Sequence, residues 1–280
     1  DHRDLHSFPT RRSSDLERTL NDGLTEGGRF LDVDASAPGK PVSEESGKPI
    51  EYTSTRVVNI SEAALLANRI VAVRDDDPVT DRFKLLRTHV FQRTRPNRWN
   101  TIQVSGFETG EGKSLMAGNL AVSIANDTRQ TTLLVDLDFR NPSLHKLFGL
   151  GDNAPGLKSY FLDDAPLEDL FVCPGVKSLT LLPAGGRIPN ATEILGSPKM
   201  EALIRELKQR YDDRYIVLDT PGIGVCPDPL VIAEYVDCIL LVARMDHTSK
   251  DSISAAMARV PREKVLGMVV NDEVTDATKY

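Results

Sequence analysis

One stretch constrains the fold of this chain more than any other, the ten residues SGFETGEGKS from Ser105 to Ser114. It follows a short apolar run at 101–104 and precedes apolar residues at helical spacing, Leu115, Met116, Leu120 and Ile124. A strand, a glycine-rich turn, Gly-Lys-Ser and a helix form the layout of a phosphate-binding P-loop. The strict pattern has glycine at position 107, where this chain has Phe107.

ATP and Mg²⁺ are the ligands that such a loop would bind. Glycines let consecutive backbone N–H groups turn towards one anion, and the helix N-terminus adds partial positive charge. We expect Lys113, which we predict as a catalytic residue, to reach the β- and γ-phosphates, and the Ser114 hydroxyl to ligate Mg²⁺. The predicted nucleotide-binding residues of the loop are Gly110, Glu111, Gly112, Lys113, Ser114 and Leu115. The alternative, a glycine-rich turn that caps an ordinary helix, is disfavoured by the acidic strand ends described next.

From residue 101 onward, apolar runs alternate with helical patterns. Continuous apolar strands joined by helical crossovers indicate a parallel sheet covered on both faces. The sequence therefore predicts an α/β fold, a P-loop NTPase-type parallel sheet with helices on both faces. Ligands of such sheets bind at the carboxyl ends of the strands. The predicted strands lie at 101–104, 132–137, 179–182, 215–218, 238–243 and 265–270.

Two carboxylates, Asp136 and Asp138, close the second predicted strand. They lie two residues apart, so on an extended chain they point to the same side. Carboxylates beside a phosphate site can hold Mg²⁺, directly or through water, and one of them can accept a proton. We predict both as catalytic and Asp136 as a metal ligand. Which of the two is the base stays open, and the plainer interpretation is a strand-to-loop turn, where Asp is common.

Polar residues also end the fourth and the last predicted strands. Asp219 follows Ile216, Val217 and Leu218, which is the Walker B arrangement, and we predict it as a catalytic residue that contacts Mg²⁺ or its water. Asn271 follows the last strand and offers both a donor and an acceptor, which suits an adenine edge. A simple turn residue is an equally good interpretation of Asn271.

Composition limits the function classes. The net charge of −7 argues against a nucleic-acid surface. Three widely spaced cysteines fit reduced thiols of a cytosolic protein rather than disulfides or a zinc site. No apolar run approaches the ~20 residues that span a bilayer.

The part of the chain before residue 79 differs in composition from the rest. Residues 1–16 have no apolar period and are similar to a translated sequencing-adaptor tail, and 17–78 are predicted to be a flexible segment with one short helix. That helix covers 61–73, with Ser61 as its cap and with Pro78, after three aspartates, as its end. The domain that carries the P-loop is predicted at 79–280.

A second helix is predicted at 81–93, with an apolar stripe of Phe83, Leu86, Val90 and Phe91. Asp81, Lys84 and Arg87 lie three residues apart on it. On spacing alone, they indicate a solvated helix face with local ion pairs.

These motifs resemble those of the bacterial tyrosine kinases (BY-kinases) of capsule and exopolysaccharide synthesis, of the CpsD/CapB type, over roughly residues 79–274. Four stretches carry the resemblance. They are similar to the family's Walker A (Gly110–Ser114 with Asn119-Leu120-Ala121), its Walker A′ (Leu134–His145), a further family block (Leu182–Gly185, Pro189-Asn190, Glu193–Leu195) and its Walker B region (Asp219-Thr220-Pro221, Asp228).

The resemblance implies an ATP-dependent protein-tyrosine (auto)kinase with protein tyrosine substrates. It implies a ring built through the 81–93 helix, where the family's Glu-x-x-Arg-x-x-Arg is matched by charge only in Asp81, Lys84 and Arg87. It also implies a separate membrane chain-length regulator as activator, and hence a cytoplasmic protein at the inner membrane. The family's tyrosine-rich tail is missing, since no tyrosine lies between Tyr235 and Tyr280, and we expect a lost tail or limited autophosphorylation.

Two other functions are considered. A positioning ATPase of the ParA/MinD class carries an extra lysine five residues before the main one, and this chain has Glu108 there. A non-catalytic, ATP-binding regulatory subunit of the polysaccharide machinery is compatible with the absent tyrosine tail.

Overall fold

The computed structural model describes residues 56–209 and 214–272. The predicted tail at 1–16, most of the predicted segment 17–78 and Tyr280 lie outside these ranges. The domain boundary at residue 79 stays a prediction.

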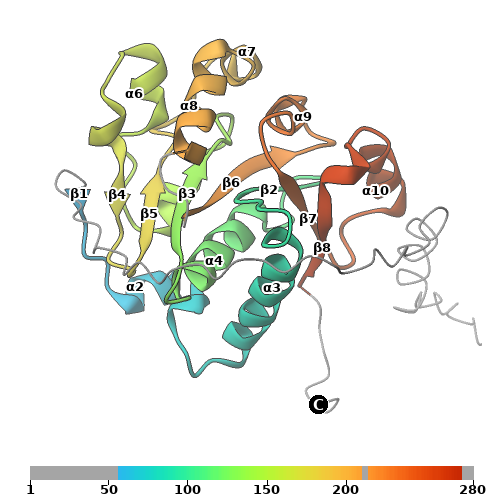
Figure 1. The fold of residues 1–280 in the computed structure, drawn as a ribbon, viewed down its shortest axis with the longest axis horizontal. Coiled ribbons are helices and arrows are strands. Elements are labelled where there is room, and N and C mark those ends of the chain that lie inside the picture. The colour runs from blue at the N-terminus through green and yellow to red at the C-terminus, as the bar shows by residue number, and fades with distance from the viewer. Residues whose placement is uncertain (1–55, 210–213, 273–280) are drawn as a thin grey trace, which may run out of the picture. The chain divides into compact units, whose positions relative to one another are not determined.

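Within the described residues, eight strands form one sheet in the order β1-β4-β5-β3-β6-β2-β7-β8 (Figure 1). From β5 to β8 neighbouring strands are parallel, whereas β4 is antiparallel to β5. Each of the six predicted strands coincides with an observed one, which confirms the predicted fold class. The strands are β1 (Arg56–Val57), β2 (Thr101–Gly106), β3 (Thr131–Asp136), β4 (Val172–Cys173), β5 (Leu179–Leu182), β6 (Arg214–Gly222), β7 (Cys238–Arg244) and β8 (Val265–Asn271).

Helices cover both faces of this sheet, as alternation of apolar strands and helices requires. Figure 1 shows α3 and α4 on one side of the strands and α8, α9 and α10 on the other. The α-helices are α2 (Glu62–Ala67), α3 (Pro78–Thr94), α4 (Lys113–Ala125), α5 (Leu144–Leu147), α6 (Leu157–Leu162), α7 (Ala191–Leu195), α8 (Pro198–Gln209), α9 (Asp228–Ile232) and α10 (Lys250–Met257). Short 3₁₀ helices lie at η1 (Val71–Val73), η2 (Leu167–Leu170) and η3 (Arg262–Lys264).

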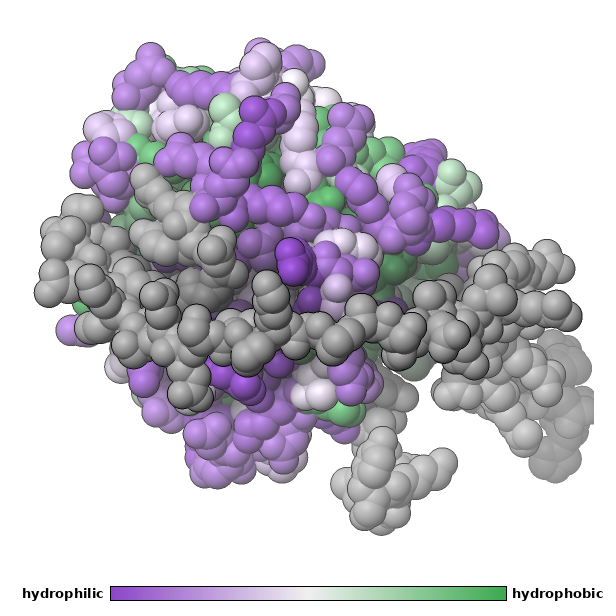
Figure 2. Space-filling model, viewed as in Figure 1, coloured by the Kyte–Doolittle hydropathy of each residue, from purple (hydrophilic) through white to green (hydrophobic). Residues whose placement is uncertain are grey.

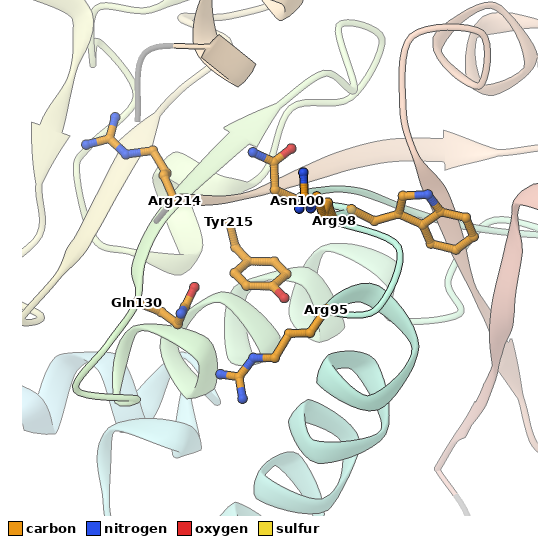
Figure 3. Close-up of a pocket in the computed structure, with 7 residues that line it drawn as sticks. Arg95, Arg98, Asn100, Gln130, Arg214 and Tyr215 are labelled. Carbon is orange, nitrogen blue, oxygen red and sulfur yellow. The ribbon is translucent and has the colours of Figure 1, made fainter. Parts of the chain in front are cut away.

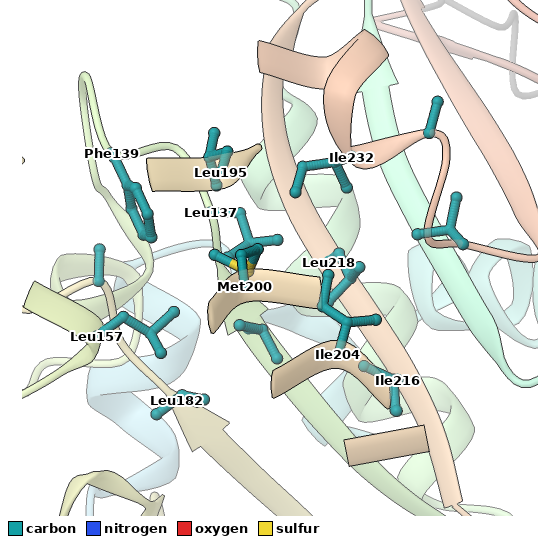
Figure 4. Close-up of a cluster of buried hydrophobic side chains, with 14 of the residues drawn as sticks. Leu137, Phe139, Leu157, Leu182, Leu195, Met200, Ile204, Ile216, Leu218 and Ile232 are labelled. Carbon is teal, nitrogen blue, oxygen red and sulfur yellow. The ribbon is translucent and has the colours of Figure 1, made fainter. Parts of the chain in front are cut away.

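The hydrophobic core has one cluster on each face. Helix α8 shows how the sequence builds the first cluster, because Met200, Leu203, Ile204 and Leu207 lie on one helical stripe and are all buried. Figure 4 shows Met200 and Ile204 against Leu137 and Leu218 of the sheet side. Burial of each such side chain contributes about 1.5–3 kcal/mol. On the other face, the predicted stripe of α3 packs against α4, with Val90 and Phe91 buried.

The structure corrects the prediction that Pro78 ends the first helix. Ser61 caps α2 as predicted, by accepting a hydrogen bond from the N–H of Ala64, but α2 ends at Ala67. Pro78 instead begins α3, three residues before the predicted start, with Asp77 as N-cap. Proline fits the first helical position because an N–H there would have no partner within the helix, so its absence costs no hydrogen bond.

Residues just before α3 belong to the core. Ile70 and Ala72 are fully buried, and Asn119 of α4 accepts hydrogen bonds from the N–H groups of Val71 and Ala72 at 2.8 and 3.0 Å.

The surface in the view of Figure 2 is mainly hydrophilic, with small hydrophobic areas between polar side chains. None of the described helices has both the length and the apolar content needed to cross a bilayer.

Candidate active site

The glycine-rich loop lies between β2 and α4, at the carboxyl end of a central strand that pairs with β6 and β7. Gly110 and Gly112 have φ of 76° and 88°, a region in which only glycine is unstrained. A Cβ on Gly112 would lie 2.3 Å from Nδ2 of Asn271. Helix α4 begins at Lys113 without a side-chain cap, so its first N–H groups are available to an anion.

Phe107, at the position where the strict P-loop pattern has glycine, has a structural role in the core. Its side chain is fully buried in the core cluster of the α8 face. Its carbonyl accepts a hydrogen bond from Gly224 N–H at 3.0 Å, and a Cβ on Gly224 would lie 2.5 Å from that oxygen. The start of the loop is therefore anchored to the segment that follows β6.

Lys113 is held inside the loop. Its Nζ donates to the carbonyl of Glu108 and lies 3.5 Å from Oε2 of Glu111. Glu111 is fully buried, and its carboxylate also accepts hydrogen bonds from Phe107 N–H at 2.8 Å and from the Thr248 hydroxyl at 2.7 Å. Sequence analysis predicted Glu111 as a nucleotide-binding residue of the loop and assigned its side chain no contact. Its side-chain contacts were missed because Thr248 is distant in the chain and matches no motif.

Asp136 and Asp219 lie side by side on neighbouring strands, where β3 and β6 pair Asp136 with Asp219 in register. Both carboxylates are fully buried. Burial raises the pKa of Asp136 to about 7, although N–H groups of Leu144, Ser143 and Asp138 oppose the shift. Burial, and then the charge of Asp136, raise the pKa of Asp219 well above its usual range. Two adjacent buried carboxylates resist simultaneous ionisation unless a cation compensates them.

The structure changes the reason why Asp136 and Asp138 are close. Strand β3 ends at Asp136, so the extended-chain argument does not reach Asp138. The chain instead turns, with Asp138 N–H donating to Oδ1 of Asp136 at 3.2 Å. Asp138 is half-buried, and burial raises its pKa, while the N–H of Asn141 and the charge of Lys113 lower it.

Asp219 is the most informative member of the site. It lies inside β6, which continues to Gly222, rather than after the strand as predicted. Neither of its buried carboxylate oxygens has a hydrogen-bond partner among the described residues, although the nearby Ser114 hydroxyl lowers its pKa. Such an orphaned pair of acceptors requires an explanation, and a cation with its water shell is one.

The predicted metal set of Ser114, Asp136 and Asp219 fits Mg²⁺ in its chemistry. All three offer oxygen atoms, and Mg²⁺ is held by one or two carboxylates while water and phosphate oxygens supply the rest. In the part of the chain that the structure describes, no cluster of three or more His, Cys, Asp or Glu side chains forms a metal cage. The residues therefore suit a cation that arrives with a nucleotide.

The known proteins that are similar to this chain include named tyrosine-protein kinases. No family model matches the chain. It is 29% identical over 195 residues to the putative tyrosine-protein kinase CapB of Staphylococcus aureus, covering 69% of this chain and 84% of CapB. It is 27% identical over 252 residues to the tyrosine-protein kinase ptk of Acinetobacter johnsonii, covering 89% of this chain and 32% of ptk.

Solved structures agree. The tyrosine kinase domain of BceF superposes with a TM-score of 0.64 at 26% identity, covering 77% of this chain and 91% of that domain. The crystal structure of the chimerical protein CapA2B2 gives a TM-score of 0.66 at 25% identity, covering 77% and 92%. The resemblance to the BY-kinases is confirmed.

The stretch that resembles the BY-kinase Walker A′ is anchored by a contact that the sequence did not reveal. Arg140 donates two hydrogen bonds to the carboxylate of Asp228, at 2.7 and 3.0 Å, and one to the Thr192 hydroxyl at 2.9 Å. Asp228 is fully buried. Burial acts to raise the pKa of Asp228, but Arg140 and Thr192 outweigh it, so that the pKa is lowered. Arg140 and Asp228 belonged to two separate family-like stretches, Thr192 lies next to a third, and only the fold brings the three residues together.

Asn271 lies at the end of β8, and its Nδ2 donates to the carbonyl of Glu111 at 3.0 Å. The side chain thus contacts the backbone of the glycine-rich loop, beside Gly112. The adenine contact that we expected for Asn271 stays a prediction.

Proposed function

We propose that the chain is an ATP-dependent protein-tyrosine (auto)kinase that regulates capsule or exopolysaccharide synthesis and export. The observation that carries the proposal is the orphaned carboxylate of Asp219, buried beside Ser114 and in register with Asp136. The names of the related proteins supply the tyrosine-kinase class.

The roles follow from position and charge. The N–H groups of residues 110–115 and the ammonium of Lys113 would hold the ATP phosphates. Ser114, Asp219 and Asp136 would hold Mg²⁺, which supplies charge neutralisation at the phosphates. Asp138 is the more accessible carboxylate, and we assign it the tyrosine proton because burial raises its pKa towards that of a useful base. Arg140 acts on this turn only as a positioning residue, through Asp228.

The positioning-ATPase alternative has a direct counter-observation. Glu108, where that class has its extra lysine, accepts a hydrogen bond from the Ser252 hydroxyl at 2.5 Å and lies 3.8 Å from Nε2 of His247. This side chain is acidic and contacts Ser252 of α10, so it cannot supply the positive charge of that lysine.

The test compares ATP binding with phosphoryl transfer. Lys113→Met is expected to abolish Mg-ATP binding measured by calorimetry, whereas Asp138→Asn should keep binding and lose ~10²–10⁴-fold in tyrosine phosphorylation. The assay uses an exogenous tyrosine peptide and an activator peptide, with phosphotyrosine read by mass spectrometry. ATP hydrolysis without any phosphotyrosine would support the ATPase alternative. ATP binding with neither activity would support a non-catalytic regulatory subunit.

We further propose a membrane chain-length regulator as activator, which would place the protein at the cytoplasmic side of the inner membrane. We also propose self-association through α3, the helix predicted at 81–93. Lys84 pairs with Asp81 at 3.1 Å, and Arg87 donates to the Ser123 carbonyl at 2.6 Å, while Leu85 is 57% exposed on the same helix. Leu85→Glu is expected to reduce the mass of any oligomer in light scattering. An unchanged mass would exclude this helix as an interface.

A further inference from the structure

A cavity lies at the opposite end of the central strand from the glycine-rich loop. It has a volume of about 510 Å³, a size typical of small-molecule sites. Its lining residues come from the end of α3, the starts of β2 and β6 and the turn before β3, namely Arg95, Arg98, Trp99, Asn100, Gln130, Arg214 and Tyr215. Strand β2 separates the cavity from the loop by six residues, about 20 Å. The cavity is therefore distinct from the proposed nucleotide site.

The ionised side chains among the described lining residues are positive. Three of the seven lining residues are arginines and none is acidic. Two described carboxylates adjoin the cavity. Asp127 lies 3.5 Å from Arg95 and compensates part of its charge, whereas Asp237 pairs with Lys208 and accepts the N–H of Asn100 at 3.0 Å. Guanidinium groups present forked donors that match phosphate and carboxylate oxygens.

The arginines surround the start of β6 rather than meeting at one point. Figure 3 shows the Arg214 side chain extending away from the Tyr215 ring, as expected for successive residues of a strand. Arg214 is only 5% exposed. Arg95 lies on the other side, stacked 3.9 Å above the Phe91 ring next to Tyr215. The arrangement suits a ligand with extent, not a single small ion.

The turn that carries Arg98 adds two independent observations. Arg98 has φ of 55°, a conformation that costs a non-glycine residue about 1–3 kcal/mol and is enriched at functional sites. The turn is held there by Arg98 N–H and Trp99 N–H, which donate to the carbonyls of Arg95 and Thr94 at 3.2 and 3.0 Å. The side-chain oxygen of Asn100 is buried and has no hydrogen-bond partner among the described residues. It therefore calls for a donor, such as a hydroxyl, from a ligand.

We propose that this cavity binds a small organic phosphate that carries hydroxyl groups. Arg98, on the same turn as Asn100, takes the phosphate, the oxygen of Asn100 accepts a ligand hydroxyl, and the Trp99 ring provides a stacking surface. The site is separate from the proposed kinase chemistry and does not depend on it.

Trp99 makes the proposal directly testable, because it is the single tryptophan of the chain. Its fluorescence is titrated with glucose 6-phosphate on the full chain in saturating Mg-ADP, so that the glycine-rich loop does not contribute. We expect a saturable change with glucose 6-phosphate, a weaker affinity for inorganic phosphate, and no change with glucose. Equal affinity for phosphate and glucose 6-phosphate, or no saturation with either, would overturn the assignment.

Matched variants locate the binding. Arg98→Gln should weaken glucose 6-phosphate about tenfold or more, since a charge-assisted hydrogen bond is lost. Arg259→Gln, an exposed arginine after α10, should leave the affinity unchanged. Asn100→Ala should weaken glucose 6-phosphate but not inorganic phosphate. Thermal melting confirms that each variant folds, and equal effects of Arg98→Gln and Arg259→Gln would overturn the proposal.

Discussion

Replacing Arg140 with glutamine should lower the free energy of unfolding, because the buried charge of Asp228 then lacks compensation. Asp228 is fully buried, and apart from Arg140 its carboxylate is contacted by the Thr192 hydroxyl and by the uncharged Cys226 thiol. Removing the guanidinium leaves a carboxylate without a compensating charge, which is the costly way to break a buried pair. We therefore expect a large loss of stability from a residue whose own side chain is 47% exposed.

The magnitude follows from distance and exposure. Two unit charges about 4 Å apart interact by about 4 kcal/mol at an effective dielectric constant of about 20. Because water reaches half of Arg140, we reduce this to about 2 kcal/mol. The double-mutant cycle of Arg140→Gln and Asp228→Asn, measured by urea denaturation at pH 7, should give a coupling energy of that size.

The pH dependence gives a second, sign-specific test. In the wild type the pKa of Asp228 is lowered, so the pair stabilises above the ordinary carboxyl pKa and loses this contribution as pH falls through the native pKa. In Arg140→Gln burial is opposed mainly by Thr192, so the pKa should rise and stability should fall as pH increases above about 4. The two proteins should therefore converge in acid and diverge towards pH 7.

The control is an exposed pair of the same chemistry, Arg205 and Glu201, which contact each other one turn apart on α8 with side chains 62% and 49% exposed. Its cycle should give about 0.3–0.5 kcal/mol. A coupling for Arg140 and Asp228 no larger than this, or parallel pH profiles, would refute the reasoning.

Two further predictions concern stability alone. Asp219→Asn should raise the melting temperature of the nucleotide-free chain by several degrees, because both buried oxygens lack partners and relief of about 1–3 kcal/mol corresponds to roughly 2–4 °C per kcal/mol; a lower melting temperature would contradict it. Gly156→Ala should lower the free energy of unfolding by about 2–3 kcal/mol in calorimetry, because the new Cβ would lie 2.2 Å from the Pro183 carbonyl. Gly151→Ala should lower it by only about 1–2 kcal/mol, because the space there is open and the cost comes from the φ of 79° alone.

Much of the fold could be predicted because its signals are local. The six main strands are continuous apolar runs, and the α3 stripe follows the helical period, so pattern alone located them. The strands β1 and β4, at one side of the sheet, have only two residues each, which is too short for any period. The order of the strands, with β6 inserted between β2 and β3, is set by tertiary packing and leaves no local signal.

The candidate site divides in the same way. Motif spacing located Lys113, Asp136 and Asp219, since strand ends and glycine-rich turns have recognisable sequences. It could not find that Asp136 and Asp219 are in register, because this depends on which strands pair. It could not predict the hydrogen bond from the Thr248 hydroxyl to the Glu111 carboxylate either, because 137 residues separate the two.

The location of Asp219 suggests how the fold tolerates its burial. Its strand pairs with β3 on one side and with β2 on the other, so Asp219 lies between Asp136 and Val104 in the middle of the sheet. Backbone hydrogen bonds on both sides hold it where it cannot turn to water. The stability of the surrounding sheet therefore offsets the free-energy cost of burying a carboxylate without a partner, as expected for a functional site. A ligand that brings a cation to Asp219 would gain affinity from relieving that cost, and it would stabilise the folded state by mass action.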